Sequence, residues 1–154
     1  MRPLSKKMDK YEGLKLKNQL CFPLYSVSNL ITRRYKPMLD ELGLTYTQYI
    51  AMMVIWEKKR VNEKELGEAL FLKSNTLTPM LQKLKAKGYL SIEKDKKDAR
   101  NLVITLTEEG EALKDKAVCV PESIAKTLDL TPEEAGFLYR ILYKILEADS
   151  NEEL

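Results

Sequence analysis

The sequence contains no histidine. Its absence removes the commonest general base, the commonest metal ligand and the usual pH switch near neutrality, so Ser-His-Asp hydrolysis and ordinary zinc sites are excluded. Cysteine is scarce as well, because Cys21 and Cys119 lie far apart and form neither a CxxC pair nor a disulfide framework. We therefore expect two reduced thiols in a cytoplasmic protein, and we expect no metal and no cofactor.

Long apolar runs are also missing. No stretch approaches the roughly 18 uninterrupted apolar residues of a membrane span, and charge rather than an apolar core follows the first methionine. We expect neither secretion nor a membrane partner. The 154 residues are 44% apolar, with 26 basic against 23 acidic side chains, which suits one globular domain. This balance excludes both an acidic disordered chain and a strongly basic nucleic-acid tail.

The first third of the chain is predicted to be helical. Apolar residues at steps of three or four trace one face of a long helix that ends at Gly43. This helix should start between Leu20 and Pro23, and Pro37 marks a kink or a break within it. Thr45-Tyr46-Thr47-Gln48 then has the spacing of a capping box and predicts the start of a second helix.

The middle of the chain is the most informative part. Two short helices, one capped by Asn62 with Glu65 and one capped by Ser74, are separated by a brief turn and resemble a helix-turn-helix. Residues 89–93 and 102–106 are predicted to form two strands joined by a charged loop, which makes a winged hairpin. After the wing we expect two further helices.

Positive charge is concentrated on this unit. Residues 73–100 hold eight basic and three acidic side chains, a net of +5, although the whole chain carries only +3. Such a segment suits phosphate binding, and a solvated lysine-rich face is the alternative. Small polar side chains on the first turns of a recognition helix reach base edges, and Arg100 at the hairpin tip is long enough for a minor groove. The candidate DNA-binding residues are Ser74, Asn75, Thr76, Thr78, Lys83, Lys96, Lys97 and Arg100.

This order of elements resembles the MarR family of winged-helix transcription regulators over nearly the whole chain, and its organic-hydroperoxide-sensing (OhrR) branch in particular. The blocks that carry the resemblance are 18–22, 35–37, 44–49 and 76–81, together with the wing sequence Asp98-Ala99-Arg100. Two departures bear on operator choice: Asn75 stands where the branch has Gly or Ala, and Lys73 replaces an acidic residue.

The resemblance implies a mainly α-helical winged helix-turn-helix with long N- and C-terminal dimerisation helices. One domain would span 1–154, with the winged helix-turn-helix at 45–106 and dimerisation helices at 14–44 and 107–148. It further implies a homodimeric repressor that binds a pseudo-palindromic double-stranded DNA operator, and not an enzyme.

By the same resemblance, Cys21 is the redox-sensing residue, an organic hydroperoxide is the oxidant, and Tyr35 and Tyr46 of the partner subunit hydrogen-bond its sulfur. The residues support this independently, because a thiolate is favoured near the positive end of a helix and attacks peroxide to give a sulfenic acid. The competing interpretation makes Cys21 a small buried hydrophobe and the tyrosines core residues.

Cys119 is a possible resolving residue for an intersubunit disulfide with Cys21, the alternative being a mixed disulfide with a small thiol. Cys119 is expected near the end of the helix after the wing, before Pro121, whereas two-cysteine members of the branch place the second cysteine past that proline. We therefore favour Cys119 as a small apolar residue near the interface.

Two rival functions remain open at this stage. One is a MarR-type regulator that responds to a phenolic or other apolar ligand, with Cys21 incidental. The other is a thiol peroxidase that uses Cys21 catalytically, which would leave the +5 segment unexplained.

Overall fold

The computed structural model describes residues 10–152 of the chain, and it is mainly helical with one small sheet. In chain order the elements are η1 Glu12–Leu14, η2 Leu16–Asn18, α1 Cys21–Leu42, α2 Tyr46–Lys58, β1 Arg60–Asn62, α3 Glu63–Leu70, α4 Ser74–Ala86, β2 Leu90–Lys94, β3 Leu102–Leu106, α5 Glu108–Ala117, α6 Val120–Leu128 and α7 Pro132–Glu152. None of the helices between residues 10 and 152 combines the length and the apolar character that a membrane crossing needs.

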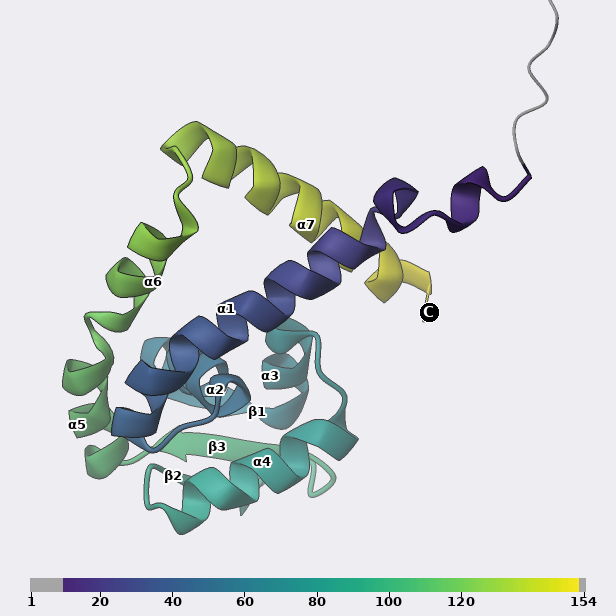
Figure 1. Cartoon of the computed structure of the whole chain (residues 1–154). Helices are drawn as coiled ribbons and strands as arrows, with labels where there is room; N and C mark the ends of the chain where they lie inside the picture. The colour runs from purple at the N-terminus through teal and green to yellow at the C-terminus, as the bar shows by residue number, and fades with distance from the viewer. Residues whose placement is uncertain (1–9, 153–154) are drawn as a thin grey trace, which may run out of the picture.

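The core lies between α2, α3, α4 and the sheet, and Figure 1 shows these elements as one compact unit with α4 along its outer edge. Met52, Ile55, Leu66, Leu81 and Ile104 are fully buried there. The sheet has the antiparallel order β1-β3-β2, so β3 is paired on both sides. This unit is the predicted winged helix-turn-helix. Of its two wing strands, β2 begins and ends one residue later than predicted, and β3 has the predicted bounds.

Strand β1 was not predicted from the sequence. Val61 pairs with Ile104 of β3, in a strand only three residues long. Asn62 ends this strand and also caps α3, where its side chain accepts from the backbone N–H of Glu65 at 2.7 Å. The predicted caps of α2 and α3 are therefore confirmed as capping boxes, because each depends only on residues three positions apart.

Helix α1 continues through Pro37, so of the two predicted outcomes, a kink or a break, the break is wrong. Pro37 lacks the N–H that would bond the carbonyl of Arg33. Both residues are exposed, so water can satisfy that carbonyl and the helix persists. The predicted start of the helix is confirmed, since Cys21 is its first residue and Gly43 closes it in the left-handed conformation.

The segment after the wing contains three helices rather than the two predicted. Helix α5 ends at Ala117, and α6 begins at Val120 with Pro121 at its second position. Pro121 has no N–H to donate to the carbonyl of Ala117, four residues earlier, and its ring crowds that carbonyl. One continuous helix is therefore disfavoured at this point. Cys119 is therefore the N-cap of α6, at the joint between two helices, and not near the end of one helix.

Two segments leave the compact unit with apolar side chains exposed. Figure 1 shows the N-terminal part of α1 projecting from the winged helix, and α7 running back toward that part of α1. The exposed large apolar side chains of residues 14–27 and of α7 are Leu14, Leu16, Leu20, Phe22, Leu24, Tyr25, Val27, Phe137, Leu138, Tyr139, Ile141, Tyr143, Ile145 and Leu146. An apolar surface of this extent marks an interaction site rather than a solvated face.

Candidate nucleic-acid interface and thiol site

The turn between α3 and α4 fixes the direction of the recognition helix. Phe71 ends α3 in the left-handed conformation, at φ 54°, and its N–H bonds back to the last turn. Gly67 permits close packing here, since a Cβ would lie 2.8 Å from the carbonyl oxygen of Leu72. Leu81 and Leu84 then anchor α4 to the core, which turns its opposite side outward.

The N-terminus of α4 differs from the prediction by one residue. Lys73, with extended backbone angles, is the N-cap, and its carbonyl accepts from the N–H groups of Thr76 and Leu77. Ser74 is therefore the first helical residue and does not cap the helix. Its side chain is exposed together with those of Asn75 and Thr76, as a base-contacting role requires.

Thr78 does not share this exposure. Its half-buried hydroxyl donates to Oε1 of Glu63 at 2.6 Å, so it braces α4 against the start of α3. Thr78 sits on the side of α4 that faces α3, which residue type alone did not reveal. The prediction that it contacts bases is not supported by this orientation.

Gln82 is an exposed polar residue of α4 that the sequence prediction missed. Asn75, Pro79, Gln82 and Ala86 are all exposed and recur at helical spacing, and we call them the outward stripe. The spacing from Asn75 was the available signal for Gln82. Lys83 is exposed on the flank beside the α1–α2 turn, where the neighbouring Lys87 donates to the carbonyl of Gly43.

The wing holds its arginine in a defined orientation. The Nε and Nη2 groups of Arg100 each donate to one carboxylate oxygen of Asp98 at 3.0 Å, and the Arg100 backbone N–H donates to the same residue at 3.1 Å. These bonds from Arg100 hold the pKa of Asp98 below its usual value. The Arg100 side chain is nevertheless 91% exposed, and Lys96 and Lys97 are exposed beside it. The wing tip therefore presents positive charge outward.

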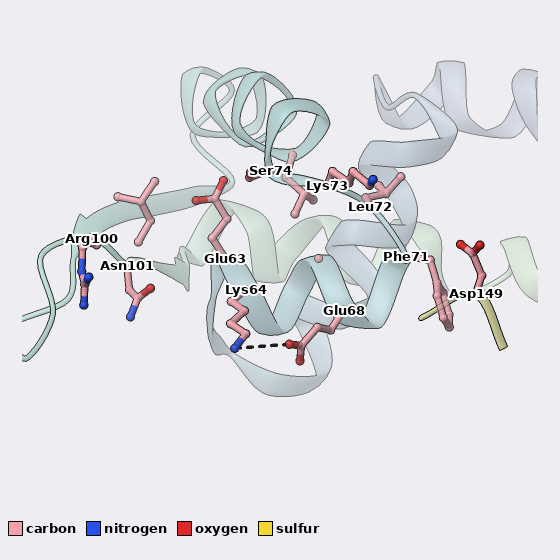
Figure 2. A pocket seen from close by; sticks show the side chains of 13 residues that line it. Glu63, Lys64, Glu68, Phe71, Leu72, Lys73, Ser74, Arg100, Asn101 and Asp149 are labelled. Atoms are coloured by element: carbon pink, nitrogen blue, oxygen red, sulfur yellow. Dashed lines mark ion pairs between the residues drawn. The ribbon is translucent and has the colours of Figure 1, made fainter. Parts of the chain in front are cut away.

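A pocket of about 490 Å³ separates the wing from the start of α4. Figure 2 shows Arg100 and Asn101 at one end of it and Phe71 and Asp149 at the other, with the Lys64–Glu68 ion pair along one side. Acidic and basic side chains both line this pocket, so it has no net preference for an anion. Phosphate contacts are expected on the exposed basic side chains at its edges instead.

Tyr35 and Tyr46 lie together in the structure. Their ring centroids are 4.9 Å apart, and Tyr35 also contacts Tyr49 at 5.7 Å. Burial, and to a lesser extent the neighbouring Tyr46 and Tyr49, raises the pKa of Tyr35 to about 12, and burial also raises the pKa of Tyr46. Both hydroxyls therefore stay protonated near neutral pH, and within residues 10–152 neither makes a hydrogen bond. They are available as donors to a group from outside the subunit.

Cys21 is not beside these tyrosines. It is the exposed first residue of α1, whereas Tyr35 lies fourteen residues later on the same helix. At about 1.5 Å of rise per residue, the two are about 21 Å apart along the axis. A single chain thus brings the two tyrosines together but leaves the thiol at the far end of the helix.

Cys119 lies on the tyrosine side of the molecule. It is exposed, and it is close enough to Tyr49 to help raise the pKa of that hydroxyl, after burial and Tyr46. Among residues 10–152, no three side chains of the His, Cys, Asp and Glu types gather as metal ligands. Both thiols of the described chain are free and exposed.

Comparisons with known proteins extend this description. A family model for the transcriptional regulators SarA and Rot matches residues 33–117. The chain is 42% identical over 139 residues to an organic hydroperoxide resistance transcriptional regulator of Bacillus subtilis, covering 90% of this chain and 95% of that protein.

Solved structures point in the same direction. AbfR of Staphylococcus epidermidis, bound to DNA in reduced and overoxidised forms, is 36% identical, with a TM-score of 0.74 and coverage of 91% of this chain and 98% of AbfR. A mutant of MarR from E. coli, bound to operator DNA, shares the fold at 24% identity and a TM-score of 0.76, over 90% of this chain and 99% of MarR.

Proposed function

Because the chain belongs to the MarR and SarA family of winged-helix transcriptional regulators, in its organic-hydroperoxide branch, we propose that it is a repressor that releases DNA when Cys21 is oxidised. The protein would act as a homodimer on a pseudo-palindromic operator, with one recognition helix and one wing in each half-site. DNA in the cytoplasm is its expected target.

The separation of Cys21 from Tyr35 carries this proposal. Cys21 is exposed at the end of an apolar segment that projects from its own subunit, and two tyrosine hydroxyls on the winged-helix side make no hydrogen bond within residues 10–152. A dimer that buries the apolar segments can bring the thiol of one subunit to Tyr35 and Tyr46 of the partner subunit. Each hydroxyl would then donate to the sulfur and stabilise the thiolate.

The reaction is a two-electron oxidation of sulfur. The thiolate attacks the terminal oxygen of an organic hydroperoxide, the O–O bond breaks, and the alkoxide that leaves takes up a proton to become an alcohol. Cys21 becomes a sulfenic acid. Condensation with a second thiol then forms a disulfide and releases water.

The tyrosines connect the thiol to the DNA-binding unit. Tyr35 packs on Tyr46 and Tyr49 of α2, and α2 forms the centre of the winged-helix core against α4. Further along α2, the indole N–H of Trp56 donates to the carbonyl of Gly110 at 2.8 Å. Modified sulfur that no longer fits between the tyrosines would displace α2 and change the spacing of the two recognition helices.

A regulatory role fits better than a peroxidase role because the fold places exposed basic side chains on the wing and the recognition helix. An enzyme that reduces peroxide has no use for that arrangement. The two roles differ in stoichiometry: a sensor consumes about one hydroperoxide per Cys21, whereas a peroxidase turns over many times when a thiol reductant is supplied.

The experiment that tests this function is a gel-shift titration of the DNA upstream of the protein's own gene. We expect the reduced protein to bind and an organic hydroperoxide to release it, with a dithiol restoring binding. Release by a phenolic ligand, with no response to hydroperoxide, would favour the ligand-responsive alternative.

A further inference from the structure

The outward stripe of α4 carries two carboxamide side chains, and we propose that Asn75 and Gln82 each read an adenine, about three base pairs apart, in every operator half-site. This inference rests on the proposed DNA-binding function and deepens it, since it names the sequence that the operator must contain.

The packing of α4 fixes which side chains point outward. Leu77, Leu81 and Leu84 are buried, so the helix cannot rotate about its axis without exposing them. Asn75 and Gln82 are exposed and seven residues apart, which places them within about 20° of each other around the helix and about 10.5 Å apart along it. Base pairs stack about 3.4 Å apart along the DNA axis, so where α4 lies along that axis in the major groove this distance corresponds to about three steps.

The two carboxamides are available to bind. The Asn75 oxygen accepts only a weak contact from the Thr76 hydroxyl at 3.4 Å, and within the described residues Gln82 makes no hydrogen bond. A carboxamide pairs in a bidentate manner with the N6 and N7 edge of adenine in the major groove. Among residues 10–152, no side chain or backbone group competes strongly for either carboxamide.

The rest of the stripe narrows the expected sequence. Pro79 and Ala86 present apolar surface between and beyond the carboxamides, which suits contact with the methyl group of thymine. The stripe contains neither Lys nor Arg, the side chains that recognise guanine in a bidentate manner. Lys83 lies on the flank of the helix, where a phosphate contact is expected.

The test is a selection from duplex DNA with a randomised central region, made with the reduced full-length protein and its variants. Wild type should enrich half-sites with adenine at two positions three base pairs apart. Gln82→Ala should reduce the preference at one position by about tenfold and leave the other intact, and Asn75→Ala should do the converse. Gln82→Lys should change the preferred base at its position from adenine to guanine.

Lys83→Ala is the matched control. It lies on the next position of the same helix and should weaken binding to all sequences alike, without changing any base preference. Unaltered base preferences in both Gln82 variants would overturn this inference alone. Failure of the wild-type protein to enrich any duplex would overturn the proposed function and this inference together.

Discussion

Cys21 and Tyr35 lie on one helix but about 21 Å apart along its axis, because fourteen residues of α1 separate them. The thiol and the hydroxyls that would hold it therefore cannot meet within one subunit. Two copies of the chain can build two complete sites, each with the cysteine of one subunit and the tyrosines of the other. Sensing and dimerisation would then depend on the same helix.

Mixed dimers test this division of the site. Consider one subunit with Cys21→Ser and a partner subunit with Tyr35→Phe and Tyr46→Phe. If the site is shared between subunits, the intact cysteine faces intact tyrosines, and this mixed dimer keeps one complete site. We expect its Cys21 to be oxidised at a rate close to that of wild type, measured by trapping the sulfenic acid.

The control is the homodimer with both tyrosine substitutions. Its Cys21 faces phenylalanine only, so oxidation should be slowed by about tenfold or more through loss of two donors to the sulfur. Equal rates in the mixed dimer and in this homodimer would show that the tyrosines act within their own subunit.

The raised pKa of Tyr35 predicts a loss of stability at alkaline pH. The folded hydroxyl ionises near a pKa of about 12, whereas the unfolded one ionises near its ordinary value of 10. Between these values the unfolded state loses its proton first, so the free energy of unfolding falls as pH rises. The Tyr35→Phe variant has no hydroxyl at this position, so this contribution to the fall in the free energy of unfolding is absent from it.

Urea unfolding of wild type and Tyr35→Phe at pH 9 and pH 11 measures this effect. The stability of wild type relative to the variant should be lower at pH 11 than at pH 9, at one fixed protein concentration. A difference that is independent of pH would mean that the Tyr35 hydroxyl is not shielded from water in solution.

The exposed arginine of the wing leads to a separate prediction about DNA affinity. Arg100→Ala should weaken operator binding by about tenfold and leave folding unchanged, because its side chain is 91% exposed. Asp98→Asn should also weaken binding, but less, since a neutral amide orients the guanidinium poorly. Affinity should fall steeply with salt for every variant.

Lys126→Ala is the control that separates the effect of net charge on DNA affinity from the effect of a wing contact. It removes one positive charge from an exposed i,i+4 pair on α6, with Glu122 at 2.8 Å, away from the wing. Its affinity for DNA should match that of wild type. An equal loss in Lys126→Ala and Arg100→Ala would assign the effect to net charge and not to a wing contact.

The two capping boxes and the start of α1 could be predicted from the sequence because each depends on residues within a few positions. Strand β1 could not, since three residues become a strand only by pairing with β3, more than forty positions away. The internal bond of Thr78 to Glu63 likewise depends on how α4 packs on α3. Local patterns predicted the elements, and tertiary packing decided which side chains remained free.

Oxidised Cys21 has two candidate fates, an intersubunit disulfide with Cys119 or a mixed disulfide with a small thiol. Because Cys119 is exposed and lies on the tyrosine side, where we place the partner's Cys21, either outcome can be observed by non-reducing electrophoresis after hydroperoxide treatment. We expect a monomer with a small-thiol adduct at Cys21 when that thiol is supplied. A covalent dimer that disappears in both Cys21→Ser and Cys119→Ser would instead establish Cys119 as the resolving residue.

The most direct test of the central claim compares operator release by wild type and Cys21→Ser under the same organic hydroperoxide. Serine keeps the size of the side chain but cannot form a sulfenic acid. The account predicts that both proteins bind the operator with similar affinity before treatment, and that only wild type releases it. Release of the operator by Cys21→Ser at the wild-type hydroperoxide concentration would contradict the account.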